Sequence, residues 1–456
     1  MKALFVPLVL FSLLPSTGRA QADSAAQQLT IERAVQSALE HNHELIAAQL
    51  EVRRAEGRVQ EAWGSALPRI DLKANYTNAI KKPVFFLPDF LNPGSGKVSA
   101  IEIGSTHAFD MSLRADQILF NAAVFVGVGT AKIYERAARE IYRAKEVETV
   151  AAARKGFYGV LLAQEVRNMM ESNLRNAEDN LRNVRILAGQ GLVSEYDLLR
   201  AEVAVDNLRP EIIRAENAER QAVNGLKILL GIPYSTAIAV TGELDLQPMD
   251  EELLSTAVTS VLDQNPSLSA LRHQVDVADA VVSVERSAYL PTLSAFGTYA
   301  YTSQKNTFTF ALPEFIASST VGLSLSLNIF NGLQTNARVE QAQLEFKKTE
   351  ESLLGMENAL QTTTESITLQ IRRARQRVEA QSRTVQQAEK GYRIAVTRYT
   401  GGSGTQLEVH DAQLALTQAK VNRMQALYDY LVAGADLDQA LGRVPEGLRR
   451  ATTEID

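Results

Sequence analysis

The sequence predicts an internally duplicated, mainly α-helical chain that carries two β-hairpins. Three observations predict this fold class: related segments recur 210 to 225 residues apart, two helical patterns run for 68 and 70 residues, and period-two stretches precede both of them. The chain has 456 residues, enough for a sizeable core and for two ordinary domains. The expected elements follow one another in the same order in both halves.

The first 22 residues predict a secretory signal peptide. Lys2 precedes an apolar stretch at 3–14, and the small-residue sequence AQA at 20–22 is typical of a cleavage site. The apolar stretch is too short to cross a bilayer as a helix, which needs about 20 residues. The chain contains no cysteine, which excludes disulfide bonds and a lipid-bearing N-terminal cysteine.

The charge balance argues against a nucleic-acid-binding protein. The formal net charge is −6, and removal of the signal peptide with Lys2 and Arg19 brings it to about −8. Proteins that bind nucleic acid normally present a basic face to the phosphates. No other stretch reaches about 18 consecutive apolar residues, so the sequence predicts no transmembrane helix.

The duplication covers nearly the whole chain after the signal peptide. We expect repeat 1 at 23–231, a linker at 232–251, repeat 2 at 252–442 and an irregular tail at 443–456. The matching segments are ALEHNHEL (38–45) and VLDQNPSL (261–268), Leu67-Pro68 and Leu290-Pro291, VFFLPDFL (84–91) and TFALPEFI (309–316), ILFN (118–121) and NIFN (328–331), and Leu230-Gly231 and Leu441-Gly442. A match of this extent indicates a true internal repeat.

Each repeat begins with a helix and a β-hairpin. The expected helices are 30–66 and 252–289, each ending at a Leu-Pro pair, and the expected hairpins are about 69–120 and about 292–330. Within the hairpins apolar residues alternate with polar ones, which indicates strands with one apolar and one wet face. The alternating apolar positions are Ile70, Leu72, Ala74 and Tyr76, then Met111, Leu113 and Ala115, then Leu293, Ala295, Gly297, Tyr299 and Tyr301, and finally Val321, Leu323, Leu325, Leu327 and Ile329.

Long helices follow the hairpins and are expected at 121–188 and 331–400, without a single proline. At about 1.5 Å per residue each is roughly 100 Å long. Their apolar residues step by three and four, which is typical of a coiled coil. Shorter return helices are expected at 194–230 and 405–441 after glycine-containing tips, so that each repeat forms a long α-hairpin.

A soluble sheet packed on helices would show the same alternation of apolar and polar residues. That alternative is disfavoured because the strands come as only two hairpins, and because the flanking helices are too long to fold back over them. Four strands cannot close a barrel, whereas three chains would supply twelve strands. The pattern therefore predicts a homotrimer with a membrane β-barrel in contact with outer-membrane lipid, continued by an α-barrel of twelve helices.

The chain resembles the TolC-type outer-membrane efflux proteins, the outer membrane factor family, over residues 28–442. The resemblance is carried by the duplicated helices that end in Leu-Pro, the Phe-Asn pairs at the strand ends, and the tip sequences RILAGQGLVSEYDLLRA and RYTGGSGTQLEVHDA. One departure is His43, where the second copy has Pro266. The resemblance implies a homotrimeric exit duct in the outer membrane with a long periplasmic helical portion. It further implies a periplasmic adaptor protein and an inner-membrane transporter as partners, in efflux or type I secretion.

The helical tips are the candidate functional site. Similarity to the family predicts that the adaptor contacts Gly191, Leu192, Val193 and Ser194 of the first tip, and Gly402, Ser403, Gly404 and Thr405 of the second. It also implies a hydrogen-bonded clasp between Asp197 and Tyr399 that holds the tip closed. A second clasp in the family uses an arginine where this chain has Gly404, so that clasp is not expected here.

Two carboxylates follow the second tip. Glu408 and Asp411 are three residues apart on the return helix, so they share one face. Threefold symmetry would turn them into acidic rings around the narrowest part of the tunnel, where they would concentrate cations. The alternative is that acids in a first turn simply favour the helix dipole, which is worth about 0.3–1 kcal/mol each.

Other classes of function find little support in the sequence. The five histidines have no metal-ligand spacing, and no nucleophile-elbow or phosphate-loop motif is present, so we expect no catalytic residue, metal or cofactor. A non-conducting, adhesin-like or structural coiled-coil protein of the envelope would explain the heptads but not the amphipathic hairpins. The loops at 81–103 and 303–318 are expected outside the cell, with Leu87, Phe90, Leu312 and Phe315 packed over the barrel mouth.

Overall fold

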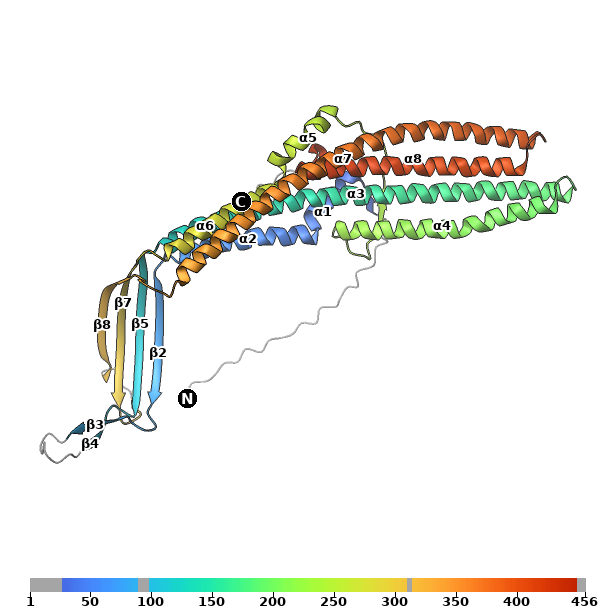
Figure 1. The fold of residues 1–456 in the computed structure, drawn as a ribbon. Coiled ribbons are helices and arrows are strands. Elements are labelled where there is room, and N and C mark those ends of the chain that lie inside the picture. Colours follow the sequence, from blue (N-terminus) through green and yellow to red (C-terminus); the bar gives the residue numbers. More distant parts are fainter. Residues whose placement is uncertain (1–26, 89–97, 310–313, 449–456) are drawn as a thin grey trace, which may run out of the picture.

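The computed structural model describes residues 27–88, 98–309 and 314–448. The expected signal peptide lies outside these residues. Figure 1 shows a long helical body with an antiparallel sheet beyond one of its ends. At the other end lie the two tips, where each long helix is connected to its return helix. Within the described part of the chain, no helix is both long enough and apolar enough to cross a membrane.

Four long helices form the part of the body farthest from the sheet. They are α3 (Ala122–Gly189), α4 (Glu195–Leu229), α7 (Gln334–Thr400) and α8 (Gln406–Ala440). Helix α3 packs on α4, α7 packs on α8, and α3 also packs on α8, so that the two α-hairpins lie side by side (Figure 1). The contact between α3 and α8 therefore joins the two copies of the repeat.

The two long helices begin differently. Asn121 caps α3, because its Oδ1 accepts a hydrogen bond of 2.9 Å from the Ala123 amide. The expected start of the second long helix at Asn331 is wrong by three residues. Gly332 and Leu333 have positive φ angles of 66° and 65°, which a right-handed helix cannot include, so α7 starts at Gln334.

The two helices that precede the hairpins are each broken, which corrects the expectation of continuous helices at 30–66 and 252–289. The first consists of α1 (Ile31–His41) and α2 (His43–Gly64), and the second of α5 (Glu251–Gln264) and α6 (Pro266–Ser287). Asn42 and Asn265 occupy the breaks with extended backbones, at ψ 122° and 117°. Each break is where a return helix ends against the body.

The breaks are joints in which one asparagine serves two helices. Asn42 Oδ1 accepts from the amides of Glu44 and Leu45, both at 3.0 Å, while its Nδ2 donates to the Leu229 carbonyl at 2.8 Å. It therefore caps the start of α2 and the end of α4. The duplicated joint is built alike, because Asn265 accepts from the Leu268 amide at 2.9 Å and donates to the Ala440 carbonyl at 2.8 Å.

Each joint is closed by a glycine that has no room for a side chain. Gly231 has φ 65°, and a Cβ atom there would collide with the carbonyl of His41. Gly442 has φ 63°, and a Cβ atom would lie 2.5 Å from the Gln264 carbonyl oxygen. The Leu-Gly pairs found in both copies therefore lie where a return helix ends against the break between two other helices.

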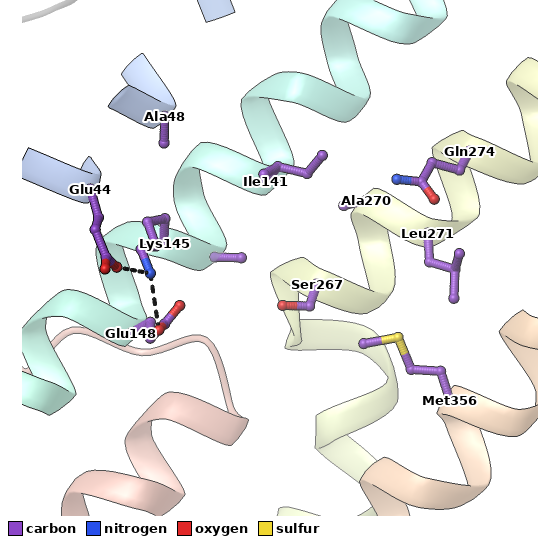
Figure 2. Close-up of a pocket in the computed structure, with 11 residues that line it drawn as sticks. Glu44, Ala48, Ile141, Lys145, Glu148, Ser267, Ala270, Leu271, Gln274 and Met356 are labelled. Atoms are coloured by element: carbon purple, nitrogen blue, oxygen red, sulfur yellow. Dashed lines mark hydrogen bonds and ion pairs between the residues drawn. The ribbon is translucent and has the colours of Figure 1, made fainter. Parts of the chain in front are cut away.

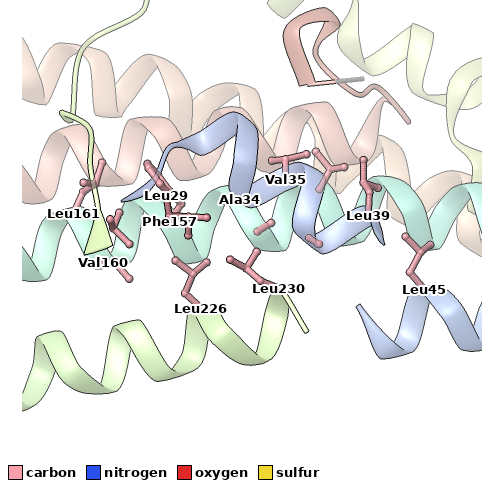
Figure 3. Close-up of a cluster of buried hydrophobic side chains, with 14 residues drawn as sticks. Leu29, Ala34, Val35, Leu39, Leu45, Phe157, Val160, Leu161, Leu226 and Leu230 are labelled. Carbon is pink, nitrogen blue, oxygen red and sulfur yellow. The ribbon is translucent and has the colours of Figure 1, made fainter. Parts of the chain in front are cut away.

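Helix α1 and two short strands form a belt that covers one side of α3 at the level of the joints. Strand β1 (Gln27–Leu29) pairs in parallel with β6 (Ile238–Val240), which lies within the expected linker. Figure 3 shows side chains of α1, α3 and α4 pointing toward one another beneath this belt. Leu29, Val35, Phe157 and Leu226 are almost fully buried there. A second core joins α5, α7 and α8 around Tyr430.

The four main strands form one antiparallel sheet in the order β2-β5-β7-β8. They are β2 (Arg69–Asn78), β5 (His107–Phe120), β7 (Thr292–Lys305) and β8 (Ile316–Ser326). Strand β8 ends before Leu327 and Ile329, which the alternation had included. The two expected hairpins are joined directly, because Met111 of β5 pairs with Tyr301 of β7.

A smaller hairpin extends the connection between β2 and β5. Strand β3 (Val84–Pro88) pairs with β4 (Val98–Glu102). The predicted packing of four apolar residues over a barrel mouth is only partly within the described residues, because Phe90 and Leu312 lie outside them. Leu87 lies in β3, whereas the Phe315 ring packs edge-on against Phe109, with centroids 5.4 Å apart.

Candidate functional site: the helical tips

The two tip turns share one backbone design. Gly191 and Gly402 have positive φ angles of 73° and 74°, as expected for residues that reverse the chain after a helix. The Leu192 amide donates to the Leu187 carbonyl at 3.0 Å, and the Ser403 amide donates to the Arg398 carbonyl at 2.9 Å. These bonds satisfy the last carbonyls of α3 and α7.

The predicted tip residues are accessible to a partner. Of the eight residues predicted to contact an adaptor, Gly191, Leu192, Ser194, Gly402, Ser403 and Thr405 are exposed, and Val193 and Gly404 are half-buried. Leu192 and neighbouring Tyr196 are 68% and 70% exposed.

The acidic residue in the first turn of the return helix is used differently in the two copies. Asp197 forms a capping box with Ser194, whose Oγ donates to the Asp197 carboxylate at 2.6 Å while the Asp197 amide donates back at 3.2 Å. The Glu408 amide likewise donates to Thr405 Oγ1 at 3.3 Å. The Glu408 carboxylate, however, lies 3.4 Å from Nη1 of Arg398.

The predicted clasp residues Asp197 and Tyr399 come near one another. Tyr399 is half-buried, and its pKa is raised, first by burial and then by the negative charge of Asp197. Among the described residues no hydrogen bond joins the two, because the Asp197 carboxylate binds Ser194 instead. The predicted clasp is therefore not formed in this conformation.

Asp411 is exposed on α8, and within the described ranges it takes part in no ion pair. Glu408 and Asp411 thus differ in their surroundings, although the sequence analysis treated them alike. Arg398 was not identified from the sequence as part of this site. Comparison of the two copies could have found it, because Arg398 lies opposite Leu187 across the duplication.

A groove separates the two α-hairpins just beyond the tips. It has a volume of about 640 Å³ and is lined by α3, α4, α7 and α8. Asn173 of α3 bridges it by accepting from Gln413 at 2.8 Å and from Thr417 at 3.1 Å. Polar contacts of this kind hold the two copies together near the tips without a tightly packed apolar interface.

A second pocket, of about 510 Å³, lies between α2, α3, α6 and α7 (Figure 2). Lys145 lies at its edge between Glu44, at 2.6 Å, and Glu148, at 3.0 Å. The hydrogen bond to Lys145 holds the pKa of Glu44 below its usual value, and the pKa of Lys145 is correspondingly raised. This ion pair ties the start of α2 to α3 next to the joint at Asn42.

In the described part of the chain, no three His, Cys, Asp or Glu side chains are grouped to bind a metal.

The sequence and the fold both match known proteins. The family described as "Outer membrane efflux protein" matches residues 34–232 and 257–443, one segment in each copy. The outer membrane protein TolC of Vibrio cholerae is 22% identical over 442 residues, covering 96% of both chains. The cobalt-zinc-cadmium resistance protein CzcC of Cupriavidus metallidurans is 25% identical, covering 97% of this chain and 100% of its own.

Solved structures show the same fold. The CmeC outer membrane channel of Campylobacter jejuni has a TM-score of 0.75 at 18% identity and covers 97% of this chain and 94% of its own. The outer membrane protein VceC of Vibrio cholerae has a TM-score of 0.74 and covers 91% of this chain and 96% of its own. Because the family match extends over most of both copies, the chain belongs to the outer membrane efflux protein family.

Proposed function

We propose that this chain forms, as a homotrimer, the outer-membrane exit duct of a tripartite efflux or type I secretion system, opened at its helical tips by an adaptor and an inner-membrane transporter. Its family is one of outer-membrane proteins, and its relatives are channel and efflux proteins rather than enzymes. The observation that carries the trimeric barrel is the sheet, which has one exposed apolar face and two unpaired edges.

The apolar face of the sheet is continuous across all four strands. The register aligns Leu72 with Leu113, Leu113 with Tyr299, and Ala295 with Leu323, so these side chains share one face. The large apolar side chains exposed on this face are Ile70, Leu72, Tyr76, Leu113, Tyr299, Val321, Leu323 and Leu325. Since the sheet lies beyond the end of the helical body (Figure 1), the alternative of a soluble sheet packed on helices does not hold. Lipid is the solvent that suits such a face.

The opposite face is polar and charged. Asp71 pairs in register with Arg114, and Arg69 pairs with Asp116. Arg114 also donates to the Asp116 carboxylate at 2.8 Å and lies over the Phe296 ring, 5.4 Å from its centroid. A face of this kind suits a water-filled lumen, as in other barrels of the outer membrane.

Closure of the sheet requires further copies of the chain. Strands β2 and β8 form its edges, and in a four-stranded antiparallel sheet they run in opposite directions. The β8 strand of one chain can therefore pair with the β2 strand of the next in the antiparallel sense. Open edges are not tolerated in lipid, and three copies give a barrel of twelve strands.

The helical body then forms a tunnel wall with the belt on its outside. Ala144 and Glu148 lie nine residues before Ala153 and Phe157, which is half a turn away around α3. The belt covers Ala153 and Phe157, whereas Ala144 and Glu148 line the pocket of Figure 2. Three belts inside the ring would fill the bore, so the pocket side faces the tunnel.

The deciding experiment is conductance in planar bilayers, with native mass measurement of the same detergent-purified protein. We expect three chains per particle and a cation-selective pore that divalent or trivalent ions block from the tip side, because rings of Glu408 and Asp411 concentrate cations. Glu408→Gln with Asp411→Asn should abolish the block and leave the trimers intact. Intact trimers without any conductance would favour the alternative of a non-conducting structural coiled-coil protein. An unchanged block in the Glu408→Gln, Asp411→Asn variant would mean that both acids serve only to stabilise the start of the helix.

Loss of the clasp should loosen the closed tip. Tyr399→Phe removes the hydroxyl that would bind Asp197, and a hydrogen bond to a charged group contributes about 1.5–3 kcal/mol. Because three clasps act on one aperture, mean conductance and open-channel lifetime should both rise. Thr400→Val, a substitution on the next, exposed residue, is the control and should change neither. A Tyr399→Phe channel that opens no more often than wild type would rule out the clasp.

A further inference from the structure

Arg398 connects the two limbs of the second tip. Its backbone carbonyl accepts from the Ser403 amide at 2.9 Å and from Ser403 Oγ at 3.3 Å. Its guanidinium donates from Nη2 to the Ser403 carbonyl at 3.1 Å, and Nη1 lies 3.4 Å from the Glu408 carboxylate. One residue at the end of α7 thereby holds the turn and contacts the first turn of α8.

Gly404 makes the space that this arrangement needs. A Cβ atom at position 404 would lie 3.0 Å from both the Arg398 Cβ and the Tyr399 amide nitrogen, closer than side chains normally approach. Gly404 does not have a positive φ, so packing rather than backbone conformation is the reason for a glycine here. The guanidinium near Glu408 comes from Arg398, on the opposite limb of the turn.

The first tip lacks this device. Leu187 occupies the position that corresponds to Arg398, and Asp197 occupies that of Glu408. The Asp197 carboxylate folds back onto Ser194 to cap its own helix, whereas the Glu408 carboxylate leaves its cap and turns to Arg398. The Arg398–Glu408 pair is therefore a property of the second copy, the copy that also carries the acids of the proposed rings.

The pair is loose enough to be displaced. The Arg398 and Glu408 side chains are 53% and 42% exposed, and the distance between their charged atoms is longer than in a bidentate pair. Exposed ion pairs of this kind are weak and are screened by salt. A multivalent cation can therefore compete with the guanidinium for the carboxylate.

We propose that Arg398 is the internal counter-ion of Glu408, so that Asp411 carries most of the charge of the acidic constriction and a cation reaches Glu408 only by displacing Arg398. This inference rests on the proposed channel function. It makes Arg398 the residue that sets how strongly the pore attracts and retains cations at its tip. The two acids then have unequal roles: Asp411 attracts, and Glu408 responds to whichever positive charge is nearer.

The test measures the La³⁺ concentration that halves conductance when the ion is added to the tip side of trimers in a planar bilayer. Arg398→Gln should lower this concentration about fivefold, because three weak ion pairs no longer compete with the bound ion. Arg398→Lys keeps the charge and should stay near wild type. Arg398→Gln with Glu408→Gln should return the concentration to the wild-type value or above it, and Asp411→Asn should raise it more than tenfold.

The outcomes separate this inference from the proposed function. If La³⁺ blocks the wild type, Asp411→Asn relieves the block and Arg398→Gln leaves it unchanged, the acidic constriction stands and the role of Arg398 falls. If the wild type and Arg398→Gln both conduct and neither is blocked, the acidic constriction and the role of Arg398 both fall, whereas the channel function stands. A weaker block in Arg398→Gln that Glu408→Gln does not modify would show that Arg398 only shapes the turn. Native mass measurement of each variant checks that it forms trimers.

Discussion

Replacement of Gly231 by alanine is expected to destabilise the protein more than any other small substitution in the helical body. The residue combines a positive φ of 65° with a site that has no room for a side chain, because an added Cβ would collide with the His41 carbonyl oxygen. An L-residue in the left-handed region costs about 1–2 kcal/mol, and the added Cβ would also push α4 away from the joint. The hydrogen bond from Asn42 to Leu229 would lengthen or break as a result.

The measurement is the midpoint of thermal unfolding of the purified protein at a fixed scan rate, followed by circular dichroism. Gly231→Ala should lower the midpoint by an amount equivalent to more than about 2 kcal/mol per chain. Gly225→Ala in α4, the helix that ends just before Gly231, is the control, because a Cβ there meets no atom within 4 Å. It should leave the midpoint unchanged or raise it by the equivalent of up to about 1 kcal/mol, since alanine stabilises a helix more than glycine does. Equal midpoints for the two variants would mean that the joint does not constrain the helices.

Introduction of a charge on the apolar face of the sheet is expected to prevent assembly in the outer membrane. Leu323 lies near the middle of β8, opposite Ala295, and is 70% exposed. An arginine facing lipid at the bilayer midplane costs about 2–4 kcal/mol, and a trimer carries three of them. Leu323→Arg should therefore remove most heat-resistant trimers from the outer-membrane fraction of cells that express the protein.

The neighbouring residue provides the control for that experiment. Ser324 pairs with Ser294 and points to the polar face, which we assign to the lumen. Ser324→Arg should assemble like the wild type and change only conductance. If Ser324→Arg is lost from the outer membrane and Leu323→Arg is retained, the two faces have been assigned the wrong way round.

The periodicity of the sequence predicts most of the fold because each long element repeats one simple rule many times. The helix expected at 121–188 is α3 at Ala122–Gly189, and the strand that starts at Arg69 is β2. The breaks at Asn42 and Asn265 could not be predicted in this way. They depend on the carbonyls of Leu229 and Ala440, which are close only after folding.

The tips show the same division between local and tertiary causes. The positive φ angles of Gly191 and Gly402 follow from local chain reversal, so the sequence was a sufficient guide. The partner of each acid was not predictable, because Asp197 and Glu408 occupy corresponding positions and yet bind Ser194 and Arg398 respectively. Only the geometry of each turn decides which donor is nearer.

The joints give the two sides of each copy different mechanical properties. Helix α3 runs unbroken for 68 residues from the sheet to the tip. Beside it, two separate helices, α2 and α4, meet end to end at the joint formed by Asn42 and Gly231. Helix α7 and the pair α6 and α8 repeat this arrangement. We therefore expect a displacement of the tips to bend the jointed side at Asn42 and Asn265, while the continuous helices α3 and α7 carry it toward the sheet.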